Sequence, residues 1–234
     1  MKARYLFLWM LLSVFGLAAQ QTDATVQASA PVDSLYREDQ FYLGLTYNIL
    51  KNRPPGVTQN NFSYGLLLGF IRDMPINKAR TVGVGIGFGY ALNAYYSNLR
   101  AIQSGDDIQY IIPGEGVSYK RNKLETHMLE LPIELRWRNS NPTDFSFWRV
   151  YAGMKLGYIV GSRSKYVTSD FKDSFYNTDT QNFQYGLTLS VGYDALNFHL
   201  YYGLNGLFED GVVGPDGAPL DIVPIRFGLV FYIL

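Results

Sequence analysis

The chain has 234 residues, in which 20 lysines and arginines balance 20 aspartates and glutamates, and it contains no cysteine. A net charge of zero gives no general reason to expect a nucleic-acid partner, and the lack of cysteine excludes disulfides and lipid attachment through a thiol. The unusual features are 19 tyrosines, 15 phenylalanines and 23 glycines beside only 17% charged residues. Because no apolar run reaches about 18 residues, the sequence predicts no transmembrane helix.

The N-terminal segment, residues 1–20, has a basic start, a short apolar core and small residues after it. This order predicts a secretory signal peptide that is cleaved between Ala18 and Gln21. A membrane-anchoring helix fits less well, because the apolar core is shorter than the ~20 residues that a span requires. Residues 21–39 are small and polar, and they predict a flexible periplasmic tail before a single domain at 40–234.

Apolar residues alternate with small or polar residues in eight segments of the predicted domain. A period of two is typical of a β-strand with two chemically different faces. Each segment is roughly ten residues long, which is the length of a strand that crosses a membrane at a tilt. The segments are 41–49, 62–70, 81–96, 129–138, 148–158, 183–192, 198–205 and 225–233.

The connections between these segments alternate in length. An even number of strands with alternating short and long connections is typical of an outer-membrane barrel. The sequence therefore predicts an all-β fold, an eight-stranded antiparallel transmembrane β-barrel, with the tail beside the short periplasmic turns. Short turns are expected near 73–80, 139–146 and 194–196, and loops on the other side near 51–59, 99–123, 161–180 and 209–221.

The two faces of the strands differ in side-chain size, and this difference predicts which face meets lipid. A soluble eight-stranded barrel would place the bulky face inside, where the space is just wide enough for side chains to fill. Large apolar residues from all eight strands would not fit there, so the bulky face is predicted to face lipid. The segment TVGVGIGFGY at 81–90 agrees, because its glycines leave room in a narrow lumen for long side chains from other strands. These glycines are Gly83, Gly85, Gly87 and Gly89.

Seven charged residues fall on the small-residue face. Charges inside a barrel are tolerable only when they are paired and hydrogen-bonded. We interpret them as a structural ion-pair network that closes the lumen, and an ion or proton path is the functional alternative. The seven residues are Glu130, Glu134, Arg136, Arg138, Arg149, Lys155 and Arg226.

Aromatic residues at the ends of strands predict where the wall meets the membrane interfaces. Trp137 and Trp148 flank one short turn on the bulky face, as expected of an aromatic girdle. The opposite girdle is predicted at Tyr95, Tyr96 and Tyr158. Separately, proline in the middle of a strand lacks the N–H for one ladder bond, so the sequence predicts a local bulge at Pro132.

No motif predicts a catalytic, cofactor-binding or metal-binding site. The segment GVGIGFG keeps its glycines at period two, whereas a dinucleotide fingerprint needs G-x-G-x-x-G before a helix. The two histidines have opposite strand parity, His199 toward the lumen and His127 on the other side, and they do not predict a metal site. His127 with a nearby acid is the one candidate for an enzymatic group, and its simpler interpretation is an interfacial histidine.

The loop near 99–123 is rich in tyrosine, arginine and charged groups. Tyrosine and arginine are enriched at the centres of protein interfaces, so this loop is the candidate surface for a protein partner. The alternative is a solvated loop without a binding role. The residues concerned are Arg100, Asp106, Asp107, Tyr110, Tyr119, Lys120 and Arg121.

Most of the chain after the tail resembles the PorT (SprT) family of outer-membrane barrel proteins. The segment LELP at 129–132 alone would suggest only the broader family of small porin-like barrels, and longer segments favour the narrower family. These are YREDQFYLGLTYNIL at 36–50, GFIRDMPIN at 69–77, GIGFGYALNAYYSNLRA at 85–101, HMLELPIELRWR at 127–138, FWRVYAGMKLGY at 147–158, QYGLTLSVGY at 184–193 and the terminal GLVFYIL.

The resemblance implies a role in type IX protein secretion and gliding motility in the outer membrane of Bacteroidetes. A member of this family is expected to support export of proteins with a C-terminal sorting domain as a non-enzymatic accessory component. Its expected partners are outer-membrane lipid and proteins of the secretion machinery, with no cofactor, nucleic acid or small-molecule substrate. A small porin or solute channel, and a lipid-modifying barrel enzyme, are the alternatives.

Overall fold

The computed structural model of the protein describes residues 39–59, 61–114, 116–139 and 147–233. The predicted signal peptide, and the predicted tail apart from Asp39, lie outside the described residues. All but the first residue of the turn predicted at 139–146 lies outside them as well.

The described part of the chain is built of strands, which confirms the predicted all-β class. Among the described residues, no helix has the length and apolar character needed to cross a membrane. The strands are β1 (Gln40–Lys51), β2 (Tyr64–Pro75), β3 (Val82–Tyr96), β4 (Arg100–Ser104), β5 (Asp107–Ile111), β6 (Arg121–Arg138), β7 (Trp148–Val167), β8 (Lys172–Tyr176), β9 (Phe183–Tyr193), β10 (Leu196–Gly203) and β11 (Val223–Ile233).

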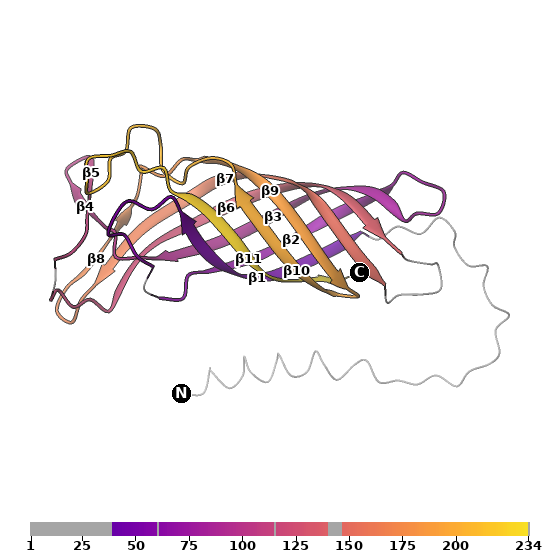
Figure 1. Ribbon diagram of the computed structural model, residues 1–234, viewed down its shortest axis with the longest axis horizontal. Helices are drawn as coiled ribbons and strands as arrows, with labels where there is room; N and C mark the ends of the chain where they lie inside the picture. Colours follow the sequence, from indigo (N-terminus) through magenta and orange to yellow (C-terminus); the bar gives the residue numbers. More distant parts are fainter. Residues whose placement is uncertain (1–38, 60, 115, 140–146, 234) are drawn as a thin grey trace, which may run out of the picture. The chain divides into compact units, whose positions relative to one another are not determined.

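Eight of these strands close into an antiparallel barrel, as the sequence predicted. Around the ring they run β1, β2, β3, β6, β7, β9, β10 and β11, so each barrel strand pairs with the next barrel strand along the chain. The ring closes where β1 pairs with β11, from Phe41 opposite Ile233 to Lys51 opposite Val223. Figure 1 shows these strands running side by side at a common tilt.

The barrel has two unlike ends, which we call the short-turn end and the long-loop end. Hairpin turns at 76–81 and 194–195 connect strands at the short-turn end. The connections 52–63, 97–120 and 204–222 gather at the long-loop end, together with β4, β5 and β8 (Figure 1). The first turn is shorter than predicted, because β2 continues through Asp73 to Pro75.

Two of the predicted loops contain regular structure, which corrects their assignment. The region 99–123 includes the β4–β5 hairpin and the first residues of β6. The region 161–180 includes the end of β7, which pairs with the short edge strand β8. These segments are dominated by small and polar residues, so their strand pattern lacks the apolar alternation that marks the rest of the wall.

A bulge lies in β7, and not at Pro132 as predicted. Met128 pairs with Ile159 and His127 with Gly161, so Val160 is an extra residue without a partner on β6. Pro132 keeps its register opposite Lys155 on β7. The register with β3 also continues past Pro132, although no pair joins it to that strand. The ladder between β6 and β3 therefore accommodates the missing N–H of Pro132 by leaving positions unpaired, and no extra residue is inserted.

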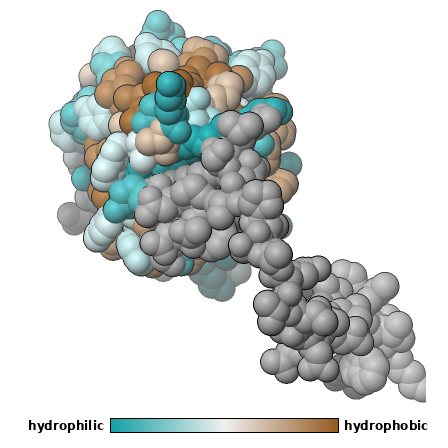
Figure 2. All heavy atoms as spheres, turned by 90° about the vertical axis from the view of Figure 1, so that its right-hand side faces the viewer, coloured by the Kyte–Doolittle hydropathy of each residue, from teal (hydrophilic) through white to brown (hydrophobic). Residues whose placement is uncertain are grey.

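The bulky face of the strands points outward and the small-residue face points inward. Phe88 is 65% exposed and Leu187 52% exposed on the outer wall, whereas Thr188 next to Leu187 is only 5% exposed. Seen from the short-turn end, hydrophobic residues lie around the outer wall and hydrophilic residues gather at the end itself (Figure 2). Because lipid is the environment in which such a wall is stable, this arrangement agrees with a membrane-spanning barrel.

Candidate functional site

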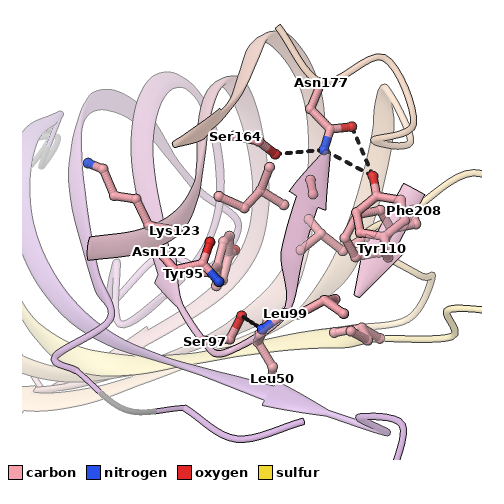
Figure 3. Close-up of a pocket in the computed structure, with 14 residues that line it drawn as sticks. Leu50, Tyr95, Ser97, Leu99, Tyr110, Asn122, Lys123, Ser164, Asn177 and Phe208 are labelled. Atoms are coloured by element: carbon pink, nitrogen blue, oxygen red, sulfur yellow. Dashed lines mark hydrogen bonds between the residues drawn. The ribbon is translucent and has the colours of Figure 1, made fainter. Parts of the chain in front are cut away.

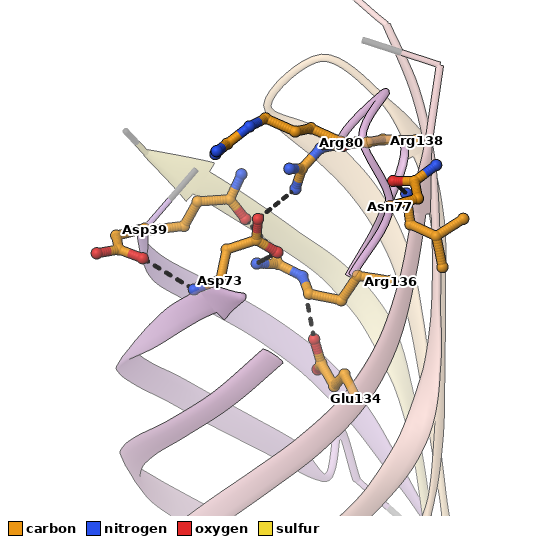
Figure 4. Close-up of polar contacts among 9 residues, drawn as sticks. Asp39, Asp73, Asn77, Arg80, Glu134, Arg136 and Arg138 are labelled. Carbon is orange, nitrogen blue, oxygen red and sulfur yellow. Dashed lines mark hydrogen bonds and ion pairs between the residues drawn. The ribbon is translucent and has the colours of Figure 1, made fainter. Parts of the chain in front are cut away.

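Near the short-turn end, one carboxylate inside the lumen contacts two arginines (Figure 4). Asp73, from the end of β2, accepts contacts from Arg136 Nη1 at 3.2 Å and Arg138 Nη1 at 2.7 Å. Arg136 also donates to Gln40 on β1, and its Nε lies 3.8 Å from Glu134. These side chains are almost completely buried. The cluster therefore links β1, β2 and β6 inside the barrel.

A second charged cluster lies farther along the lumen, around Glu130 on β6. Its two carboxylate oxygens contact Lys155 Nζ at 2.8 Å and Arg226 Nη1 at 3.1 Å. Arg226 also donates to Asn93 Oδ1 at 3.3 Å. Glu130 thus joins β6, β7 and β11, and Arg226 extends the cluster to β3 through Asn93. Buried charges need this degree of pairing to offset their loss of hydration.

Aromatic rings provide the remaining contacts of the buried guanidinium groups. Arg226 lies over the ring of Tyr201 at 3.7 Å, and Arg136 over the ring of Tyr151 at 4.0 Å. Arg149 lies 4.5 Å from the ring of Phe147, and within the described residues it makes no ion pair. Cation–π contacts of this kind strengthen when water is excluded. The structure thus places all seven predicted lumen charges inside the barrel, but rings as well as carboxylates surround them.

The glycines of β3 provide the space for these inward side chains. A Cβ atom on Gly85 would come within 2.6 Å of Arg136 Cδ, and one on Gly87 within 2.7 Å of Ile71. At Gly89 the added atom would collide with the hydroxyl of Tyr42. Gly83 also faces inward, and a Cβ atom added there would lie 3.2 Å from Asp73 Oδ1. Gly85 and, less closely, Gly83 therefore make room for charged side chains as predicted, whereas Gly87 and Gly89 make room for uncharged ones.

The lumen leaves almost no free space between these side chains. A cavity beside Tyr42, Glu134 and Lys155 measures about 10 Å³. This volume is at the lower limit of what one water molecule needs. Inward residues of moderate or large size, among them Leu67 and Tyr232, fill the lumen. The inner face therefore contains more large side chains than the sequence predicted.

Packed loops cover the barrel at the long-loop end. We call this cluster the loop cap, and its buried members come from β1, β3, β4, β5 and the region 204–222. A cavity of about 30 Å³ among these residues, larger than the ~10–15 Å³ that one water molecule needs, is drawn in Figure 3. The buried members are Leu50, Tyr95, Ala101, Tyr110, Leu207, Phe208, Leu220 and Ile222.

A polar network fastens the loop cap to β7 (Figure 3). Asn177 Nδ2 donates to Ser164 Oγ at 2.8 Å and to the hydroxyl of Tyr110 at 3.0 Å. Burial raises the pKa of the Asp179 carboxyl, a hydrogen bond from Tyr110 lowers it, and the negative charge of Asp107 raises it. The upward effects dominate, so Asp179 holds its proton more tightly than an ordinary aspartate.

The loop proposed to bind a partner divides into buried and exposed residues. Tyr110 is only 6% exposed within the loop cap, so its prediction as an accessible recognition residue is wrong. Arg100 is half-buried and lies 4.0 Å over the ring of Tyr166. Tyr119 is half-buried as well. The exposed members are Asp106, Asp107, Lys120 and Arg121, of which the first two lie at the tip of the β4–β5 hairpin.

All but one of the aromatic residues predicted to form the two girdles lie on the outer wall of the barrel. Trp137 and Trp148 are 45% and 54% exposed, Tyr158 is exposed and Tyr96 is half-buried. Tyr95 is buried in the loop cap, so its assignment to a girdle is wrong. The physical reason is strand parity, because the outward residues of β3 have even numbers and Tyr95 has an odd one.

Both histidines have hydrogen-bonded partners that the sequence did not identify. His199 Nδ1 lies 2.8 Å from Ser190 Oγ inside the barrel, where both residues are buried. His127 Nδ1 lies 2.5 Å from the Tyr90 hydroxyl at the outer wall, and its Nε2 lies 3.7 Å from Glu125. Within the described ranges, no group of three or more acidic, histidine or cysteine side chains has the arrangement of a metal site.

Asp73 is the main lumen residue that sequence reasoning misses. The composition of 73–80 predicts a turn, although Asp73 continues the inward parity of Gly69 and Ile71. Extending the alternation by two residues would find it. The stacking tyrosines have the correct parity, but nothing in a single sequence indicates which ring faces which guanidinium.

These features define a barrel that crosses a membrane, has a side-chain-filled lumen and is covered by its own loops. The chain belongs to the family described as outer membrane protein beta-barrel domain, whose model matches residues 18–209. The protein is therefore an outer-membrane β-barrel protein. No curated protein matches the chain.

Proposed function

We propose that this protein is a non-conducting, non-enzymatic barrel that supports type IX protein secretion and gliding motility as an accessory component. The filled lumen is the observation that carries the proposal, because it leaves the rim, the loops and the outer wall as the surfaces available for function. The secretion role rests on the resemblance to the PorT family in the segments quoted above. Export through the general secretory pathway with cleavage of residues 1–20 belongs to the same proposal.

A porin would require a continuous aqueous path, and two features oppose one. The clusters around Asp73 and Glu130 cross the lumen at two levels, and the loop cap covers one mouth. Planar-bilayer recordings of the purified protein test this point. We expect no steps above the baseline of protein-free bilayers, whereas stable unitary conductance steps would favour the porin alternative.

A lipid-modifying enzyme would need an accessible nucleophile beside a base. The Ser190–His199 pair is buried within the lumen, and the charged residues that act on His199 are the cations Lys155 and Arg226, not a carboxylate. His127 is bonded to a phenol and lies close to Glu125, without a hydroxyl nucleophile of serine type among its bonded partners. A Ser-His pair requires both exposure and an orienting acid to act in acyl transfer.

The tip of the β4–β5 hairpin is the exposed part of the predicted partner loop. Asp106 and Asp107 lie there in solvent and are not among the buried members of the loop cap. Shortening residues 103–118, which the sequence alone would suggest as a test, would also remove Tyr110 from the cap. The sharper variant is therefore Asp106→Lys, which reverses one charge at the tip and keeps Asp107, whose charge acts on Asp179 beside the cap.

The proposed function is tested by deleting the gene and comparing secreted proteins by mass spectrometry. We expect proteins with a C-terminal sorting domain to disappear from the medium and return when the wild-type gene is restored. The hairpin variant should lower their export at an unchanged barrel level on immunoblots. Asp216→Lys, an exposed charge reversal in another loop, is the matched control. An unchanged secretome in the deletion strain would contradict the secretion role.

A further inference from the structure

The bulge at Val160 reverses which residues of β7 face the lumen, because it inserts one extra residue into the strand. Before the bulge, odd-numbered residues such as Arg149 face the lumen, whereas after it even-numbered residues such as Tyr166 do. Arg163 is consequently exposed on the outer side, and Lys165 is half-buried there. The extra residue therefore brings two cations to the outside of the barrel at the long-loop end.

These two cations belong to a larger group on three adjacent strands. Lys165 pairs with Lys123 on β6 on one side and with β8 on the other. One row farther out, Val167 lies between Arg121 and Lys172. The positive charges of Arg121, Lys172 and Lys123 all act on Lys165. We call this group the basic wall, and it consists of Arg121, Lys123, Arg163, Lys165 and Lys172.

Most of this positive charge is not neutralised by the protein. Lys123 is paired with Glu125. For the other four cations, no ion pair is formed within the described part of the chain. Of the nearby acids, Glu125 also lies opposite Arg163 in register, and its negative charge acts on Lys165. Asp173 pairs in register with the buried Tyr166 and so lies on the opposite face, and Asp170 accepts a bond from Ser169 at 2.8 Å. Glu125 thus faces five cations of the basic wall, which retains an excess of positive charge that an anion would offset.

The position of the basic wall relates it to the membrane. Leu129, Tyr158 and Phe183 form one cross-strand row of exposed apolar and aromatic residues below it. Lys123 lies six residues beyond Leu129, about 20 Å along the strand, which is about 15 Å along the membrane normal at a tilt near 40°. Arg163 lies closer to this row. Because lysine and arginine side chains extend toward an interface, their charges reach the layer of lipid headgroups.

We infer that the basic wall binds phosphate groups of an anionic lipid in the leaflet at the long-loop end. The cations lie on the same outer face as the exposed aromatic row, and this position favours a membrane lipid over a soluble anion. Charge complementarity selects a phosphate-bearing headgroup, and each cation near such a surface contributes about a fivefold gain in binding. Long loops of outer-membrane barrels face the cell exterior, so the occupant is a phosphorylated lipid of the outer leaflet.

The inference is tested by titrating the purified full-length protein in dodecyl maltoside micelles with diphosphorylated lipid A. Binding is followed by microscale thermophoresis. We expect the double variant Arg163→Gln with Lys165→Gln to bind about 30-fold more weakly, because two cations of the basic wall are lost. Arg72→Gln with Lys78→Gln, which removes two exposed cations at the short-turn end, is the matched control and should change binding less than about threefold.

The lipid arms separate the phosphate contribution from general adsorption. Wild-type protein should prefer diphosphorylated over monophosphorylated lipid A and bind phosphatidylcholine weakest. Equal affinity for all three lipids, or equal losses in both double variants, would overturn the inference. Displacement of lipid A by an equal concentration of inorganic phosphate would show an anion site that does not require a lipid, and would overturn the lipid assignment. Heat-modified migration on gels checks that each variant is folded.

Discussion

Among single residues, Asp73 has the most demanding surroundings inside the barrel. Its carboxylate is completely buried and neutralises two arginines from a strand that is more than 60 positions away in the sequence. Removing one partner of a buried ion pair leaves charge without compensation, which costs far more than the intact pair contributes.

Asp73→Asn should therefore lower the free energy of unfolding by about 3–5 kcal/mol. The measurement is urea unfolding in detergent micelles, followed by tryptophan fluorescence. Asp106→Asn is the control, since this exposed carboxylate should change stability by about 0.5 kcal/mol or less. Similar midpoints for the two variants would show that Asp73 does not have the stabilising role that we assign to it.

At this scale the sequence predicts where a side chain points more easily than what it touches. Strand parity alone places Glu130, Lys155 and Arg226 on the lumen face. Their contacts depend on how strands separated by up to 96 positions are placed around the ring, which no local pattern contains. For the same reason, the stacking of Arg226 on Tyr201 could not be predicted.

Among the elements, the loop cap has a pH-dependent contact at Asp179. The net rise in the pKa of Asp179 means that the folded cap binds a proton more readily than the unfolded chain does. A raised pKa adds stability that is fully present below the unfolded value of about 3.9, and this stability is lost as pH rises through the folded value. The cap should thus open more easily at neutral than at acidic pH.

Hydrogen-exchange mass spectrometry of peptides from the region 172–182 tests this expectation. After correction for intrinsic exchange rates, protection should be greater at about pH 4 than at about pH 7. Asp179→Asn, which mimics the protonated side chain, should retain the stronger protection at both values. If the wild-type protein and the variant respond to pH in the same way, another group controls the cap.

The strands of the wall should respond to a charge according to its depth in the membrane. Leu187 is exposed in the middle of β9, where arginine costs about 2–4 kcal/mol, whereas Leu204 is exposed just beyond β10 near the rim, where the cost is about 0–1 kcal/mol. Leu187→Arg should therefore reduce the amount of assembled barrel much more than Leu204→Arg. The measurement is the amount of folded protein in outer-membrane fractions. Equal amounts for the two variants would contradict the predicted dependence on membrane depth.

Element prediction is most reliable where apolar alternation is strong and least reliable where polar residues form strands. The eight wall segments are recognisable because every second residue is bulky. The end of β7, with the sequence GSRSKYV at 161–167, resembles a loop because its outward residues are charged and its inward residues are mainly small. The one-residue shift at Val160 also hides the pattern, since it reverses parity within a single strand.

At the scale of the whole molecule, closure of the ring leaves no free edge in the membrane-spanning wall. Each backbone group there can pair with a neighbouring strand, which is the requirement for crossing lipid. We expect the folded protein to migrate faster than the boiled protein on gels containing dodecyl sulfate. Circular dichroism of the same sample should show β-structure. Identical migration with and without boiling would contradict a closed barrel.

The seam between β1 and β11 also has a consequence for the order of assembly. All other wall pairings join successive barrel strands, so a growing sheet can add strands one after another with short chain closures. The contacts between Arg226 and Glu130, and between Arg136 and Gln40, each span 96 positions and become possible only as the sheet curls into a ring. Until then these groups stay hydrated, and their dehydration coincides with closure. We therefore expect completion of the seam and burial of the lumen charges to occur together, as one late step of assembly.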